Sequence, residues 1–389
     1  MVFVFNKMLH NFAKTKNSKA MKKLSFLLLA AFAGILVHAQ STVFFTSEIT
    51  PESLVKIYKA LGVSPQGNVA IKISTGESMQ SNYLRPEFIK DLVVETHATL
   101  VECNTTYSGN RSSTASHKKA IEERGFTAIA DVDIMDEEGD MEIPMADTSH
   151  LKVNTVGSHL KNYDFMINLA HFKGHAMGGF GGVIKNQSIG IASRRGKALI
   201  HSAGRNDVSE RWYNYTSDQD GFLECMAAAA QAVHNYFGEG KIIYINVMNN
   251  LSVDCDCDGH PHAPQMNDIG ILASTDPVAL DKACLDLVFN HQSTSADNAQ
   301  PLINRITQRH GTHTVEYAEK IGLGSQQYTL VNIDDASIED VNANTEDKHN
   351  LRYNVFTIDG KKVLTNAKSL DTLPSGVYII NGQKKIIAK

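Results

Sequence analysis

Two segments of the chain concentrate residue types that could do chemistry. The first, "HFKGHAMGGFGGVIKN" from His171 to Asn186, places five glycines among two histidines and two lysines. Glycine allows a backbone to approach a bound group closely, and lysine supplies the charge that an anion needs. We therefore interpret the segment as an anion site in which Lys173 and Lys185 supplement converging backbone N–H groups. The glycines of this site are Gly178, Gly179, Gly181 and Gly182.

The glycine-rich segment matches no standard nucleotide motif. No Gly-Lys-Ser/Thr follows the glycines, and "GGFGG" lacks the G-x-G-x-x-G spacing. A glycine turn with a purely structural role is therefore the alternative to an anion site.

The second segment, from Asp254 to His262, is the densest set of metal-ligating side chains in the sequence. Thiolate and imidazole groups suit Zn²⁺ and similar ions. We expect a zinc-like divalent ion to be bound by Cys255, Cys257, His260 and His175. The spacing is not that of a standard zinc knuckle, so a solvated acidic loop is the alternative. The two cysteines are too close in sequence for an easy mutual disulfide.

Strand-like and helical patterns alternate through the middle of the chain. Strands are expected at 68–74, 99–103, 164–170, 241–248 and 269–274. Helices are expected after Pro86, after the capping residues Ser112 and Ser113, and after Asp276 as N-cap with Pro277 as first helical residue. This alternation predicts an α/β fold with a mostly parallel sheet and flanking helices.

Ligands of such sheets bind beyond the carboxyl ends of the strands. The loops that follow the strands ending at Cys103, Ala170 and Met248 should therefore meet at one edge. That arrangement would add Asn104 and Arg111 to the two segments already described. Three other histidines, His117, His201 and His234, are interpreted as ordinary helix or surface residues.

The N-terminus has the features of an export signal. Met21-Lys22-Lys23 precedes the apolar stretch "LSFLLLAAFAGILV", and small residues at Val37 and Ala39 precede a cleavage site before Gln40. The apolar run is shorter than the roughly 18 residues of a membrane span. We expect an exported mature protein, and either Met1 or Met21 could be the start. The net charge of −5 argues against nucleic acid as a partner.

The five cysteines do not form a disulfide framework. Cys225 and Cys284 lie in apolar helical patterns and are expected to be buried. Cys103 and the two cysteines of the acidic loop remain chemically available.

Four ordered blocks resemble the domain of unknown function 362 family, from roughly Val69 to Gly324. They are "SNYLRPEFI", "CNTTYSGNRSSTASHKKAIEERGF", "HFKGHAMGGFGGVIKNQSIGIASRRGKALIHS" and "DCDCDGHPHAPQMNDIGILASTDPVALDKACLDLV". The family has no settled reaction. Many members carry a ferredoxin-like insert with two four-cysteine runs, whereas this chain has "AGRNDVSERWYNYTSDQDG" there, without cysteine. This departure from the family pattern implies that an iron–sulfur cluster is absent.

The tail resembles the C-terminal sorting domain of type IX secretion. Its features are an Asp359-Gly360 hairpin turn, the stretch "LPSGVY" from Leu373 to Tyr378, and a final basic strand. The resemblance implies a small sandwich-like all-β domain that contacts the type IX secretion machinery. A stabilising β appendage of the main domain is the alternative.

These patterns predict a leader and signal peptide at 1–39, an α/β domain at 40–335, a linker at 336–350 and a sorting domain at 351–389. We expect an exported, metal-assisted enzyme acting on a small anionic substrate. Its candidate catalytic residues are Asp254, Asp256 and Lys173. A non-catalytic metal-binding or anion-binding protein is the second interpretation, and a thiol redox protein is the third.

Overall fold

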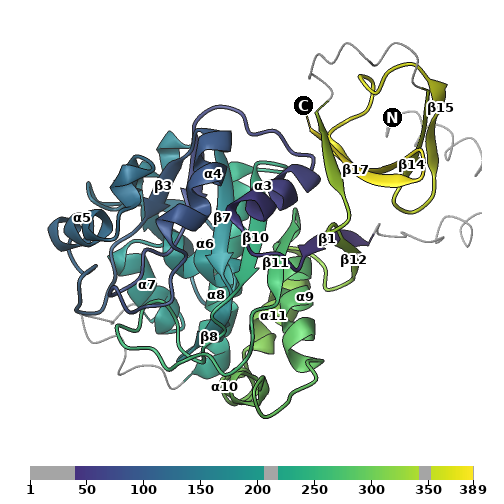
Figure 1. Ribbon diagram of the computed structural model, residues 1–389. Helices are drawn as coiled ribbons and strands as arrows, with labels where there is room; N and C mark the ends of the chain where they lie inside the picture. The colour runs from purple at the N-terminus through teal and green to yellow at the C-terminus, as the bar shows by residue number, and fades with distance from the viewer. Residues whose placement is uncertain (1–39, 206–217, 341–351, 389) are drawn as a thin grey trace, which may run out of the picture. The chain divides into compact units, whose positions relative to one another are not determined.

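The computed structural model describes residues 40–205, 218–340 and 352–388 (Figure 1). The described residues from Ser41 onward belong to one compact unit. The expected leader and signal peptide lie outside the described residues, as do residues 341–350 of the expected linker.

An eight-stranded sheet forms the centre of the described chain (Figure 1). In spatial order its strands are β12 (Tyr328–Asn332), β1 (Ser41–Thr46), β11 (Gly270–Ser274), β10 (Ile242–Met248), β7 (Phe165–His171), β2 (Val69–Lys72), β3 (Thr99–Glu102) and β4 (Val132–Ile134). Five of its seven strand pairings are parallel, and only β11 runs antiparallel to both of its neighbours. The predicted α/β class with a mostly parallel sheet is confirmed.

Helices cover both faces of this sheet because alternate residues along each strand point to opposite faces. On one face, Ile71 and Ile167 pack in a cluster with α3 (Pro51–Ala60) and α4 (Pro86–Thr96). The α5 helix (Thr114–Glu123) contributes to the same cluster.

On the other face, Ala70 and Met166 belong to a second apolar cluster. Its helices are α6 (Val183–Ile191), α7 (Arg194–His201), α8 (Gln219–Phe237), α9 (Pro277–Phe289), α10 (Gln300–Gln308) and α11 (Thr312–Lys320). The site is therefore built on a sheet that is packed on both sides.

The predicted helix caps are present. The Asp276 side chain accepts hydrogen bonds from the N–H groups of Val278 and Ala279 at the start of α9. Ser113 accepts from the N–H of Ser116 at the start of α5. These short-range bonds satisfy donors that a helix leaves unpaired at its first turn.

The strand order reverses between β2 and β7. After β2 the chain adds β3 and β4 on one side, and β7 and then β10 are added on the other side. The connections therefore leave β2 and β7 in opposite directions, which opens a crevice beyond their carboxyl ends. Lys72, Glu102 and His171 end their strands at this edge.

A second, five-stranded sheet forms near the C-terminus. Its order is β13 (Ser337–Asp340), β17 (Gln383–Ala388), β16 (Gly376–Ile380), β14 (Tyr353–Thr357) and β15 (Lys362–Ala367). It is antiparallel apart from the β13–β17 pair. The N–H of Gly360 bonds to the carbonyl of Thr357, which makes the expected turn. This sheet has its own apolar cluster, and its Val377 and Ile386 also share a cluster with Leu54 of α3.

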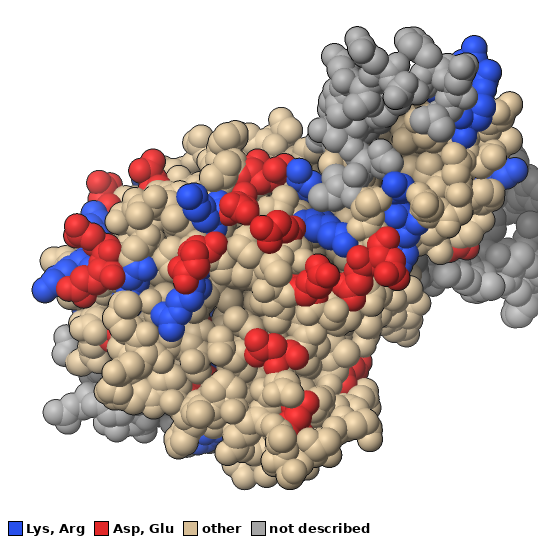
Figure 2. All heavy atoms as spheres, viewed as in Figure 1, with Lys and Arg blue, Asp and Glu red and all other residues tan. Residues whose placement is uncertain are grey.

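Among the described residues, no helix is both long and apolar enough to cross a membrane. Figure 2 shows acidic and basic side chains interspersed on one face of the molecule. The charged side chains on that face therefore do not segregate by sign.

Candidate functional site

The glycine-rich segment forms a short hairpin directly after β7. Its strands are β8 (Lys173–His175) and β9 (Gly179–Gly181), and α6 begins immediately afterwards. The hairpin therefore lies at the carboxyl edge of the sheet, where the strand order reverses.

Gly174 brings this hairpin against the cysteine-containing loop that follows β10. Its N–H donates to the carbonyl oxygen of Ser252 at 2.8 Å. A Cβ atom at Gly174 would overlap the Val253 carbonyl group and lie 2.6 Å from the Val253 Cα atom. The absence of a side chain at Gly174 thus allows the two predicted segments to meet.

A buried carboxylate locks the two segments together. Asp256 contacts the Nδ1 atom of His171 at 2.7 Å and accepts from the Lys173 ammonium at 2.9 Å. Its carbonyl oxygen accepts from the N–H of Glu77, in the loop after β2. Burial by itself would raise the pKa of Asp256, but Lys173 and His171 hold it well below its usual range. Asp256 is therefore an ionised anchor rather than the free base expected from the sequence.

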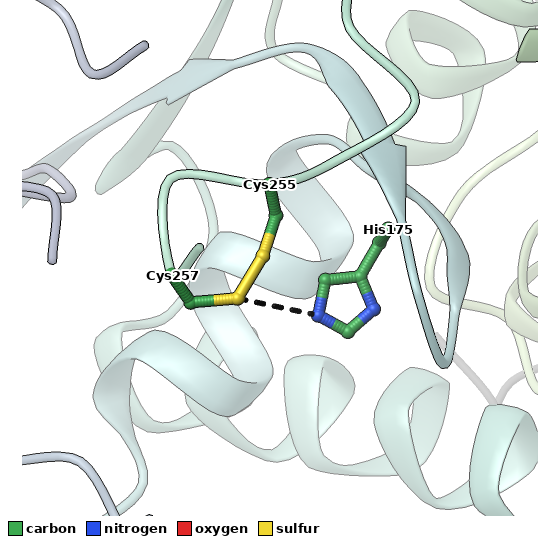
Figure 3. A group of neighbouring side chains, drawn as sticks. All are labelled: His175, Cys255 and Cys257. Atoms are coloured by element: carbon green, nitrogen blue, oxygen red, sulfur yellow. Dashed lines mark hydrogen bonds between the residues drawn. A yellow bond between two sulfur atoms is a disulfide. The ribbon is translucent and has the colours of Figure 1, made fainter. Parts of the chain in front are cut away.

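Cys255 and Cys257 form a disulfide bond (Figure 3). The expectation that they are too close to pair is wrong. A turn in which the N–H of Asp258 bonds to the carbonyl of Cys255 folds the loop, and the cysteine Cα atoms lie 5.2 Å apart. That separation is within the usual disulfide range.

His175 lies beside this sulfur pair. Its Nε2 atom is 4.0 Å from the Cys257 Sγ atom, and the ring faces the two sulfurs (Figure 3). Ligand atoms of His175, Cys255 and Cys257 all lie within 4.8 Å of one another, so the group could hold a metal ion. In the disulfide state, however, neither sulfur is the thiolate that binds zinc.

The hairpin backbone determines which nitrogen of His175 carries a proton. The Nδ1 atom accepts hydrogen bonds from the N–H groups of Gly178, at 2.8 Å, and Met177, at 3.2 Å. An accepting Nδ1 bears no hydrogen, so the neutral ring is protonated at Nε2. Burial, followed by the nearby cation of Lys185, lowers the pKa of His175 well below its usual value, which keeps the ring neutral.

A cavity of about 210 Å³ lies next to this group. Its charged lining consists of five cations and two carboxylates: Lys72, Arg111, Lys173, Lys185, Lys197, Glu102 and Asp256. Two cations have carboxylate partners, since Arg111 pairs with Glu102 at 3.1 Å and Lys173 pairs with Asp256. Within the described residues, no carboxylate lies at ion-pair distance from the other three.

Two of these three lysines are hydrogen-bonded to backbone or amide oxygens. Lys72 donates to the carbonyl of Ile73 and to Asn186, and Lys197 donates to the carbonyl of Ala192. Among the described residues, the Lys185 ammonium has no hydrogen-bond partner. Burial, followed by the repulsion of Lys173, lowers the pKa of Lys185 to about 7. Burial lowers the pKa of Lys72 to about 8.

A glycine leaves room for the Lys72 ammonium group. A Cβ at Gly190, inside α6, would lie 2.6 Å from both the Cε and Nζ atoms of Lys72. A Cβ at Gly181 would meet the side chains of Lys185 and Lys173 at ordinary contact distances of 3.5 and 3.6 Å. A glycine inside a helix costs about 1 kcal/mol relative to alanine, so the position of Lys72 is maintained at some expense of helix stability.

The structure brings together only part of the predicted site. The cavity lining includes the two cysteines together with Lys173, Lys185, Gly181, Gly182 and His175. Arg111 also lines it, but its guanidinium contacts Glu77, Glu102 and Tyr107.

The remaining predicted residues are absent from the cavity lining: Asn104, Gly178, Gly179, Asp254 and His260. Asn104 bonds to Asp136, and Asp254 bonds to His262. Gly179 has a positive φ of 80° and faces the backbone of Gly311, so its role is conformational.

Several lining residues were missed from the sequence, and those that can carry charge are Lys72, Glu102, Lys197 and His201. His201, which had been assigned to an ordinary helix position, is buried, and burial lowers its pKa to about 3. One signal was present, because Lys72 interrupts the apolar strand "VAIKI". A second was the spacing of Lys197 and His201, four residues apart on one helix face.

The family model described as domain of unknown function (DUF362) matches residues 69–286, which is more than half of the chain. The chain belongs to the DUF362 family. Every residue that lines the cavity falls within the matched range. The DUF362 domain therefore contains the whole candidate site.

Other comparisons add little to this assignment. No curated protein gives a significant match. Among solved structures, the lactate racemase apoprotein from Thermoanaerobacterium thermosaccharolyticum is similar at 12% identity and a TM-score of 0.35. The match covers 75% of this chain and 82% of that chain. A likeness at this score supports no conclusion about the activity of the DUF362 domain.

Replacing Gly174 by alanine tests the contact between the two segments. We expect Gly174→Ala to lower the free energy of unfolding by about 1–3 kcal/mol, because the added methyl overlaps the Val253 backbone. Gly178→Ala is the matched control, since its Cβ would meet its nearest neighbours at an ordinary 3.5 Å. Urea denaturation measures both changes. Equal stability of the two variants would mean that Gly174 is not what allows the close approach.

Proposed function

We propose that this chain binds a small anion in the lysine-lined cavity and acts on it as an enzyme. The observation that supports the proposal is the presence of three lysines, Lys72, Lys185 and Lys197, with no carboxylate at ion-pair distance in the described structure. Buried charges are normally paired, and their mutual repulsion is relieved by a ligand of opposite sign. The binding of an anion among them would supply the missing charge.

The size of the cavity limits the substrate. Its volume of about 210 Å³ is below the roughly 300–1,000 Å³ of pockets that hold drug-sized ligands. A phosphate-bearing or carboxylate-bearing molecule of a few heavy atoms matches both the size and the charge.

Lys185 is the best placed proton-transfer group. Its pKa, lowered to about 7, allows the ammonium and the free amine to interconvert near neutral pH. A general acid or base works best when its pKa is close to the working pH. In this proposal Lys185 both attracts the anion and exchanges a proton with it, and Lys173 remains paired with Asp256.

The proposal predicts that Lys185→Met weakens the binding of inorganic phosphate to the full-length chain by about tenfold or more. A hydrogen bond to a charged group contributes about 1.5–3 kcal/mol. Isothermal titration calorimetry measures the affinity. Lys119→Met is the control, because the Lys119 side chain is 76% exposed and is not part of the cavity lining. Wild-type protein that binds none of phosphate, sulfate or a short dicarboxylate would contradict the proposal.

The pH dependence of phosphate binding is a second test of the lysine site. Lysine is cationic below its pKa, and the ligand-free values are about 7 for Lys185 and about 8 for Lys72. Phosphate binding should therefore be tightest below pH 7 and weaken as the pH rises through 7 to 8. A sulfate titration is the control, since sulfate keeps the same charge throughout this range. Sulfate affinity that stays constant over the range would contradict the assignment.

A metal-assisted form of this enzyme is the second candidate, favoured by the proximity of His175, Cys255 and Cys257. Binding a metal would require reduction of the disulfide. It would also require Nε2 of His175 to lose its proton, which means that Nδ1 could no longer accept from Gly178. His260 is exposed and lies outside this group, so the zinc-like site would have three ligands from the chain.

The metal-assisted form predicts that the reduced protein retains about one zinc ion per chain, as expected for a thiolate site. The oxidised protein and a Cys255→Ser/Cys257→Ser variant should retain none, because the first has no thiolate and the second has no thiol. Elemental analysis after gel filtration measures the content. Reduced wild-type protein without stoichiometric zinc would remove the metal from the proposal and leave the anion site unaffected. A metal with an open coordination position would favour catalysis over simple capture.

We also infer that the chain is exported, that its tail from 351 acts as a type IX sorting domain, and that it works without an iron–sulfur insert. The signal features of residues 21–39 and the "LPSGVY" stretch support the first two inferences. The absence of cysteine between His201 and Gly221 supports the third, although residues 206–217 lie outside the described structure. N-terminal sequencing should place the mature start near Gln40. A stable cellular protein that begins at Met1 or Met21 would contradict export.

A further inference from the structure

The Cys255–Cys257 disulfide lines the same cavity as the lysines. Cys257 is half-buried and contacts His175, whereas Cys255 is buried. The other three cysteines are reduced and buried. One of these, Cys103, also lines the cavity, but burial raises the pKa of its thiol to about 12, and the thiol donates to the carbonyl of Ile191. The disulfide is therefore the sulfur group to which an incoming reactant has access.

A stabilising role does not account for this disulfide. The stabilisation that a disulfide brings by restricting the unfolded chain increases with the number of residues in the closed loop. Here the cysteines are separated by a single residue, Asp256. Such a loop is among the smallest that a disulfide can close, so its entropic contribution is minimal. The position of Asp256 is already secured by His171 and Lys173.

The neighbouring histidine is arranged as a hydrogen-bond donor to sulfur. Because Nδ1 of His175 accepts from Gly178 and Met177, its Nε2–H group is directed at Cys257 Sγ, 4.0 Å away (Figure 3). This proton would block a metal ion, but it would stabilise a thiolate that forms on Cys257.

We propose that Cys255 and Cys257 form a redox-active disulfide that exchanges with a dithiol reductant, and that Cys257 is the sulfur that leaves as a thiolate. This activity goes beyond anion binding and is independent of it. The reductant is defined by its chemistry, as a molecule or protein that carries two neighbouring thiols.

The exchange takes place in two balanced steps. Because both sulfurs line the cavity, a thiolate of the reductant reaches Cys255 Sγ from the cavity side and forms a mixed disulfide with it. The Cys255–Cys257 bond breaks, and its electron pair remains on Cys257 Sγ. The second thiolate of the reductant then attacks its own sulfur in the mixed disulfide and releases Cys255 as a thiolate. Two electrons pass to the protein, the reductant leaves as a disulfide, and both cysteine thiolates are free to take protons from water.

The charge around the cavity also favours the formation of thiolates. The attacking group and both leaving groups are anions, and the lining carries five cations against two carboxylates. Cationic surroundings stabilise thiolates and raise their local concentration. The lysines that lack carboxylate partners therefore favour exchange as well as anion binding.

Alkylation of the native, full-length protein tests the activity. Protein purified without reductant is incubated with dithiothreitol, quenched with iodoacetamide and analysed by peptide mass mapping. We expect Cys255 and Cys257 to be modified only after reduction. Cys103, Cys225 and Cys284 should stay unmodified because they are buried. A pair that is already free in untreated protein, or that is reduced only when the protein unfolds, would overturn the proposal.

The role of His175 is tested by two substitutions. His175→Asn keeps an acceptor for the Gly178 N–H but loses the donor to Cys257, so we expect the rate of reduction to fall about tenfold, as for loss of one hydrogen bond to a charged group. His175→Gln places an amide donor near the Nε2 position and should retain more of the rate. His260→Ala is the control on the same loop, and it should react like wild type because its ring is exposed.

Thermal unfolding of each variant, measured beside the rates, separates a folding defect from a chemical one. A folded His175→Asn variant that reacts at the wild-type rate would overturn the assignment of Cys257 as the leaving sulfur. Phosphate calorimetry keeps the two proposals apart. If the protein binds phosphate but resists reduction, only the redox-active disulfide is contradicted. If the protein is reduced but binds no anion, only the proposed function is contradicted.

Discussion

The geometry of the site depends on one buried carboxylate. The Asp256 side chain contacts His171 at the end of β7 and Lys173 at the start of β8. Its carbonyl group accepts a hydrogen bond from the N–H of Glu77 in the loop after β2. Three loops from different strands are thereby held against one another. Since cysteines flank Asp256 in the sequence, the same contacts also place the sulfur pair beside His175. A residue that resembled a catalytic base is the anchor on which the catalytic candidates depend.

A second constraint is the need to keep several ammonium groups close together in a buried space. Gly190 provides room for Lys72, and amide or carbonyl oxygens solvate Lys72 and Lys197 in place of carboxylates. Neutral acceptors hold a lysine without cancelling its charge. The cavity therefore retains a positive field, which full ion pairing would have removed.

Cysteine and histidine in proximity can bind a metal or exchange electrons, and their hydrogen bonds distinguish these roles. At His175, backbone donors occupy Nδ1 and leave a proton on Nε2. A metal ligand would have the reverse arrangement, with Nδ1 donating and Nε2 free. The hairpin turn that follows β8 thus sets which nitrogen of His175 faces the sulfur pair as a donor.

The sequence by itself determined the α/β class, the positions of five of the eight strands of the central sheet, and the caps at Ser113 and Asp276. These follow from local periodicity and short-range hydrogen bonds. It also predicted that the glycine-rich and cysteine-rich segments would lie at one edge of the sheet. It could not identify Lys72 and Lys197 as neighbours of Lys185, nor exclude Asn104 and His260 from the cavity, because side-chain contacts depend on register and packing between distant segments. Only the tertiary structure paired Cys255 with Cys257, because a turn in their loop brings the sulfurs together.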